Sequence, residues 1–182
     1  LVFICMSCDN RKNSQVESTE KPTFVFQPFA GFPLKSLAYV KRRLIKTFPE
    51  IQINQTINLP INALNQPKTR YRADTLLNFL SKRTKPGFVT IGFTTKDIST
   101  SMGAKGDDWG IFGLGGQSKQ SCIVSTYRLK GQNKLDKLYK LAIHEIGHTQ
   151  GLMHCTNEGC FMMDAHGKDH FNKLKGFCAS CE

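Results

Sequence analysis

Two periods of apolar residues alternate along the chain from about residue 23 onward. A short run of β-type residues predicts a strand over 23–27, and apolar residues at every second position predict strands over 51–53 and 89–93. Apolar residues spaced by three or four predict helices over 33–48, which is bounded by prolines, and over 74–82. In the first of these helices we expect the basic residues 41–43 and 46 to face water. Strands separated by helices of this length imply crossover connections, so we expect a twisted, mostly parallel sheet.

A glycine-rich segment, 102–116, precedes the next predicted strand. Its glycines surround Trp109, Ile111 and Phe112, a composition typical of a loop or a bulged strand. The β-branched and aromatic run 122–127 then predicts a strand. Because glycines let another backbone approach closely, this strand is a candidate edge on which an extended peptide lies. A plain surface hairpin is the alternative.

The third predicted helix spans about 133–151. Asn133 is a favourable N-cap residue, and Asp136 follows in the first turn. Four apolar residues at helical spacing form its predicted buried face: Leu135, Leu138, Tyr139 and Ala142. Gly151 can adopt a positive φ, so we expect it to end the helix and turn the chain back.

Three histidines lie on this helix and just after its turn. His144 and His148 are four residues apart, so both project from one helical face about one turn apart. The turn at Gly151 brings His154 back toward them. Three nitrogen ligands with an open fourth position are typical of a catalytic zinc site. The alternative is that the three histidines pack in a core or scatter over a surface.

Length, composition and charge narrow the class of protein. The chain has 182 residues, 40% of them hydrophobic, which suits one globular domain and excludes a disordered chain. No apolar run approaches the roughly 18 to 20 residues that span a bilayer. The formal net charge of +11 predicts attraction to anionic partners without choosing among them. A zinc-stabilised binding module with basic faces at 41–46 and 68–72 is therefore one alternative function, and a zinc hydrolase acting on a non-peptide bond is another.

Five of the cysteines are separate from the N-terminal segment. Cys122 lies in an apolar stretch, which predicts a small core residue. The other four crowd the C-terminal part, 155–182, and their spacing predicts a structural Cys₄ zinc site: Cys155, Cys160, Cys178 and Cys181. Two disulfides are the alternative, and an oxidising compartment would favour them.

The N-terminal segment is typical of the end of an export signal. An apolar opening contains Cys5 and ends at Ser7 and Cys8, and a polar run follows it. A small residue before a cysteine resembles a bacterial lipoprotein cleavage site, which makes Cys8 the candidate lipidated residue. We therefore expect a signal remnant over 1–8, a polar tether over 9–22 and a single domain over 23–182. The expected location is the membrane, as a lipoprotein exported from a bacterial cytoplasm, with the cytoplasm as the alternative.

The histidines belong to a longer pattern that resembles a known signature. The pattern HExxHxxGxxH at 144–154 is similar to the extended zinc signature of the metzincin metallopeptidases. The continuation C-x₄-C-x-M at 155–162, followed by C-x₂-C at 178–181, is similar to the archaemetzincin branch of that superfamily. Segments 92–98 and 124–129 also resemble strands of that branch.

The resemblance implies a fold and an activity. The implied fold is an α/β (α+β, metzincin-like) domain with a mostly parallel sheet, an antiparallel edge strand, three main helices and a small zinc-clipped C-terminal part. The implied activity is hydrolysis of a peptide or protein substrate by a zinc-activated water, with Glu145 as general base. Met162 would lie in the turn beneath the catalytic metal. The resemblance further implies a second zinc, held by the four late cysteines, and so two zinc ions per chain. We expect a monomer, and no nucleic-acid partner because no basic stripe interleaved with aromatic residues supports base stacking.

A second donor to the developing oxyanion is not fixed by this pattern. Tyr127, His166 and His170 are the candidates, and ordinary surface or packing roles are the alternative for each.

Overall fold

The computed structural model describes residues 22–66, 69–103, 106–116, 120–164 and 168–182. Leu1 to Lys21 lie outside this part, so it does not test the signal, the tether or the lipidation of Cys8. Among the described residues, no helix is long and apolar enough to cross a membrane.

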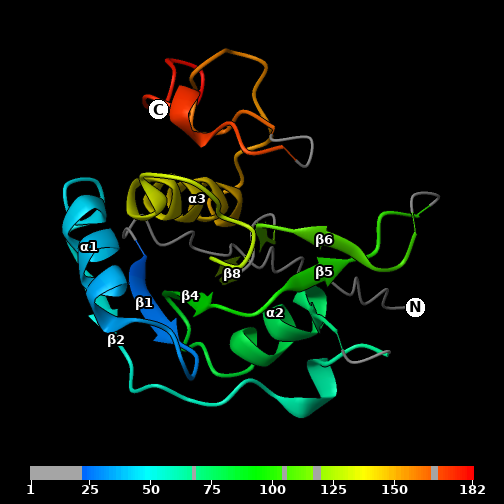
Figure 1. The fold of residues 1–182 in the computed structure, drawn as a ribbon. Helices are drawn as coiled ribbons and strands as arrows, with labels where there is room; N and C mark the ends of the chain where they lie inside the picture. The colour runs from blue at the N-terminus through cyan, green and yellow to red at the C-terminus, as the bar shows by residue number, and fades with distance from the viewer. Residues whose placement is uncertain (1–21, 67–68, 104–105, 117–119, 165–167) are drawn as a thin grey trace, which may run out of the picture.

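A five-stranded sheet with the order β2-β1-β4-β8-β7 forms the centre of the fold (Figure 1). Four of its strands run parallel: β1 (Thr23–Pro28), β2 (Ile51–Ile53), β4 (Phe88–Thr94) and β8 (Ser121–Ser125). The last strand, β7 (Gly113–Gly115), pairs antiparallel with β8. The expected mostly parallel sheet with an antiparallel edge strand is confirmed.

Helices cover both faces of this sheet. α1 (Leu34–Leu44) and α3 (Lys134–Thr149) pack on one face, and α2 (Ala73–Ser81) packs on the other (Figure 1). The central strand β4 is buried along nearly its whole length because it has apolar layers on both sides. The described residues also contain the 3₁₀ turns η1 (Ile61–Ala63) and η3 (Phe171–Lys173).

The glycine-rich segment forms two short strands rather than one loop. A second, three-stranded sheet contains β3 (Tyr71–Arg72), β5 (Ile98–Thr100) and β6 (Trp109–Ile111). The chain passes from β6 through a bend at Phe112 directly into β7, and so it leaves the small sheet and enters the large one. This small sheet is absent from the sequence-based expectations.

One expectation about the peptide-binding edge is wrong. The strand over 122–127 was the candidate edge, but β8 lies between β4 and β7. β7 forms the edge instead. Its three residues, two of them glycine, carry too little strand propensity to mark it in the sequence.

Details of two helices also differ from expectation. α1 ends at Leu44 rather than at Phe48, although Phe48 still stacks on Phe24 at 4.6 Å between ring centroids. Asn133 precedes α3 with φ of 60° and makes no side-chain cap hydrogen bond, and Leu135 is 41% exposed rather than buried.

Arg43 was expected to face water, but it lies over the Tyr139 ring and pairs with Asp136 at 3.0 Å, so it joins α1 to α3.

Candidate active site and metal centres

α3 and the turn after it bring three histidines together. His144 and His148 project from the same face of the helix, with their Nε2 atoms 3.2 Å apart. Gly151 adopts φ of 88°, and the Leu152 N–H donates to the Gly147 carbonyl at 3.0 Å, so the helix ends in a tight left-handed turn. His154 then returns to the pair. The three ligand nitrogens lie within 4.8 Å of one another.

The outer nitrogens of these rings orient the inner ones. His144 Nδ1 lies 2.7 Å from the Phe161 carbonyl oxygen, and His148 Nδ1 lies 2.8 Å from that of Leu152. A carbonyl only accepts, so each Nδ1 donates its proton and each Nε2 keeps its lone pair. Two lone pairs 3.2 Å apart repel unless a cation lies between them. The donor set therefore fits a metal ion, and zinc is bound well by three imidazoles.

The carboxylate of Asp164 lies near the His154 ring. His154 Nδ1 lies 3.6 Å from Asp164 Oδ2, and the His154 side chain is 50% exposed. Carboxylates that accept from the outer nitrogen of a histidine fix its orientation and raise its basicity. Asp164 could not be predicted as a site residue from the sequence. It follows Met162 by two residues, and this spacing matches no motif that would mark it.

Burial sets the protonation of the site in the chain without metal. Desolvation lowers the pKa of His144 to about 4 and also lowers the pKa of His148, so both rings are neutral ligands near pH 7. The same cause raises the pKa of Glu145 to about 8, partly opposed by a hydrogen bond from the Gly115 backbone N–H.

Glu145 and the histidines line one cleft of about 510 Å³. The edge strand β7 and the preceding β6 form one wall, and residues after the metal-binding turn form the other, including Met163, Asp164, His170 and Phe171. Most of the wall is apolar, so the cleft suits the side chains of an extended peptide. Of the candidate oxyanion donors, His170 lines the cleft. Tyr127 is 60% exposed and is not among the cleft-lining residues, and His166 lies outside the described residues.

Met162 lies beneath the catalytic helix. It is fully buried, and a Cβ built on Gly147 would lie 2.4 Å from its Sδ. The helix is therefore in close contact with the sulfur at the turn between the metal-binding histidines. Met163 lines the cleft instead. The packing places Met162 against the helix that carries His144 and His148, and its role beneath a metal ion stays a prediction.

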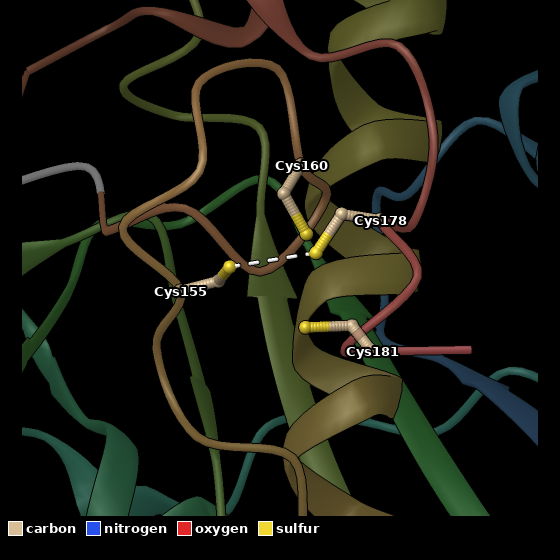
Figure 2. Close-up of side chains that lie close together, drawn as sticks. All are labelled: Cys155, Cys160, Cys178 and Cys181. Atoms are coloured by element: carbon tan, nitrogen blue, oxygen red, sulfur yellow. Dashed lines mark hydrogen bonds between the residues drawn. The ribbon is translucent and has the colours of Figure 1, made fainter.

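Four cysteines form a second cluster (Figure 2). Two come from the loop after His154 and two from the C-terminal end of the chain, and their sulfurs lie within 4.8 Å of one another: Cys155, Cys160, Cys178 and Cys181. All four are free thiols, and the Cys155 and Cys178 sulfurs are 3.6 Å apart. Cys122, by contrast, is fully buried in the core as expected.

The thiols differ in acidity. The Asn157 side-chain amide donates to Cys178 Sγ at 3.2 Å and helps to lower the pKa of that thiol to about 6. Burial and the neighbouring thiols raise the pKa of Cys181 to about 12. Four converging sulfurs cannot all ionise unless a cation neutralises them. A closed shell of four thiolates is the usual environment of a structural zinc, so the residues fit that ion.

The basic segment over 68–72 does not form a free cationic face in the part of the chain that the structure describes. Arg70 pairs with Asp97 at 2.8 Å and with Asp108 at 3.0 Å. Arg72 pairs with Asp74 at 3.0 Å. These guanidinium groups hold loops together, which leaves little charge for an anionic partner.

Comparisons with known proteins agree with the geometry. Peptidase family M54 matches residues 109–182. An archaemetzincin of Nanoarchaeum equitans is 34% identical over 126 residues, which cover 69% of this chain and 68% of that protein. Crystal structures of archaemetzincins have the same fold. That from Archaeoglobus fulgidus matches with a TM-score of 0.73 and 22% identity over 87% of this chain and 98% of its own. That from Methanopyrus kandleri matches with a TM-score of 0.74 and 20% identity over 91% and 94%.

These matches confirm the resemblance first seen in the histidine and cysteine patterns. The family match over residues 109–182 includes the helix, its turn and the cysteine loop, where the two residue clusters could each hold a zinc ion. The chain belongs to the archaemetzincin family of zinc metallopeptidases.

Proposed function

We propose that this chain cleaves an extended peptide or protein substrate in the cleft beside β7, with Glu145 as general base. The histidines His144, His148 and His154 would hold the catalytic zinc, and the four late cysteines a structural one. The observation that carries the proposal is that one ring nitrogen of each histidine lies within 4.8 Å of the others, and that the histidines and Glu145 line the same cleft. Bound zinc supplies a Lewis acid for the attacking water and the scissile carbonyl.

Glu145 has the environment that a base needs. Its side chain is 5% exposed, so bulk water does not compete for the proton that it takes. Burial alone favours the protonated form, whereas a nearby cation favours the carboxylate. The carboxylate then accepts the proton of the attacking water and passes it to the nitrogen of the leaving amine.

The edge strand offers a place for the substrate backbone. Within the described residues, β7 pairs with β8 on one side only, so its other edge is open to an added strand. An extended peptide can pair with such an edge through main-chain hydrogen bonds. The apolar walls of the cleft would then receive its side chains.

Replacement of Glu145 tests this proposal. The full chain with zinc is incubated with a peptide library, and products are identified by mass spectrometry, for wild type, Glu145→Ala and Glu50→Ala. Glu50 lies outside the described cleft and serves as the matched control. We expect cleavage by wild type and control, and a loss of about 10²- to 10⁴-fold in Glu145→Ala. Unchanged cleavage in Glu145→Ala would contradict the assignment.

We also propose that Cys8 is lipidated and anchors the domain over 23–182 through the tether over 9–22, as a monomer at the membrane of a bacterial cell. The support is the sequence pattern alone. Expression with a radiolabelled fatty acid tests it. Label that is present in the full chain and lost in Cys8→Ser supports the anchor, and label that is absent from both contradicts it.

A further inference from the structure

The edge strand β7 presents two glycines to the catalytic helix. Successive residues of a strand point to opposite faces, so Gly113 and Gly115 share one face and Leu114 takes the other. Leu114 packs against the hydrophobic cluster on the α2 side of the sheet. The two glycines face α3 at its zinc-binding turn, where their nearest neighbours belong to Glu145 and His148.

Neither position has room for a side chain. A Cβ on Gly113 would lie 2.6 Å from Oε1, 2.8 Å from Cγ and 2.9 Å from Cδ of Glu145. A Cβ on Gly115 would lie 2.6 Å from the Glu145 carbonyl oxygen and 2.8 Å from His148 Cβ. Real Cβ atoms essentially never approach other heavy atoms within 3.0 Å, so either methyl group would displace something.

A methyl group would displace a different part of α3 at each of the two glycines. The three atoms nearest to a Cβ on Gly113 all belong to the side chain of Glu145, so a methyl group there pushes the carboxylate. Gly115 touches the helix backbone and the stem of His148, so a methyl group there separates strand and helix. Neither the strand nor the helix can move away easily. β8, itself paired with β4, holds β7, and α3 is buried along most of its length.

The close approach of β7 to α3 also allows a hydrogen bond between them. The Gly115 backbone N–H donates to the Glu145 carboxylate. The strand therefore lies against the Cγ, Cδ and Oε1 atoms of this side chain at Gly113, and it donates a hydrogen bond to the carboxylate from Gly115. These contacts limit the conformations open to Glu145, which is only 5% exposed.

We propose that Gly113 and Gly115 are positioning residues for Glu145, because their missing side chains let β7 lie against α3 and hold the carboxylate in the cleft that the histidines line. The inference rests on the proposed function of Glu145 as base. It assigns the two glycines a role in the rate of the chemical step rather than in metal binding alone.

Kinetics of glycine-to-alanine variants provide the first test. Gly176→Ala is the matched control, because a Cβ there meets nothing within 4 Å and the residue does not have a positive φ. With a quenched fluorescent peptide that the wild type cleaves, we expect Gly113→Ala to lower kcat by about 10- to 100-fold, because misplacement of about 1 Å has effects of that size. KM and zinc content should stay near the wild-type values. Gly115→Ala should lower kcat and also weaken zinc binding, because it presses on His148.

Shortening the base separates positioning from general damage. Glu145→Asp removes one methylene and withdraws the carboxylate from the space that a methyl group on residue 113 would take. We therefore expect Glu145→Asp to lower kcat less in the Gly113→Ala background than in wild type. Losses that multiply independently would overturn the inference, and so would Gly113→Ala with wild-type kcat.

A stability cycle tests the contact without any activity. Thermal unfolding of the metal-free chain is measured for wild type, Gly113→Ala, Glu145→Ala and the double variant. Gly113→Ala should lower the midpoint by about 3 °C or more in wild type and by much less in the Glu145→Ala background, where the clashing side chain is gone. Equal shifts in both backgrounds would overturn the inference. If the wild type cleaves no peptide but the cycle shows coupling, the proposed function fails while the contact stands.

Discussion

Replacing Glu145 by glutamine should stabilise the metal-free chain, even though it removes the proposed base. Burial raises the pKa of this carboxyl from its ordinary value of 4.5 to about 8. The folded chain therefore holds the proton more tightly than the unfolded chain does. Stability is fully present below pH 4.5 and falls as the pH rises towards 8, because the unfolded chain releases the proton first. Glutamine has no proton to lose and escapes this penalty.

The size of the effect follows from the difference between the two pKa values. At about 1.4 kcal/mol for each pH unit, the difference sets a ceiling of about 5 kcal/mol above pH 8. Relaxation of the site around a charge lowers this figure, so we expect a gain of about 2 to 4 kcal/mol. For a chain of this length, the gain corresponds to about 5 to 15 °C in the unfolding midpoint.

Thermal unfolding in a chelator at pH 5, 7 and 9 measures this gain. The histidines titrate alike in both proteins, so their contribution cancels when the two are compared at one pH. The midpoint difference between Glu145→Gln and wild type should be small at pH 5 and grow towards pH 9. With zinc bound, the difference should shrink, because the cation favours the carboxylate. A difference that does not change with pH, or a less stable Glu145→Gln at pH 9, would refute the reasoning.

Three further substitutions probe other parts of the account. Arg128→Ala should lower the free energy of unfolding by about 2 to 4 kcal/mol in a urea titration, because it leaves the buried Asp97 carboxylate with one guanidinium instead of two; a loss below about 0.5 kcal/mol would contradict this. Gly147→Ala should destabilise by about 1 to 3 kcal/mol, since its Cβ would lie 2.4 Å from buried Met162 Sδ, and an unchanged unfolding midpoint would argue against that contact. Cys181→Ser should reduce the zinc content, measured by atomic emission, from two ions per chain to one, whereas two retained ions would exclude this cysteine as a ligand.

The main elements of the fold could be predicted because their signals are local. Leu76, Leu77 and Leu80 recur at helical spacing and are all buried in α2. Alternation over 89–93 likewise marked the central strand. The parallel arrangement followed, because strands separated by helices must be joined by crossovers.

Features set by neighbouring elements could not be predicted. Leu135 has the spacing of a buried residue, but it is 41% exposed, because spacing alone does not say whether another element packs on the first turn of α3. Arg43 sits among basic residues of α1, yet it packs on Tyr139 because α3 lies beside it. Which strand forms the edge depends on the order of the strands in the sheet. The glycines of β7 do not indicate a strand by themselves, and they form one where they pair with β8.

The candidate site divides in the same way. His144 and His148 are four residues apart in one helix, and the turn at Gly151 follows at once. This local pattern allowed the three candidate metal-binding histidines to be predicted. Asp164 and the glycines of β7 join the site only through tertiary contacts. A glycine at every second position in a strand was the one available signal, since it indicates close approach of another backbone without saying which one.

The central claim is that zinc at the histidine site and Glu145 together cleave a peptide. Stepwise addition of zinc to the full chain, after a chelator has removed its metal, tests this claim most directly. Cleavage of a library-selected peptide is followed against added zinc, for wild type and Glu145→Ala. The account predicts that both proteins bind two ions per chain, and that only wild type gains cleavage as the histidine site fills. Cleavage by zinc-free wild type, or equal cleavage by Glu145→Ala at two bound ions, would contradict it.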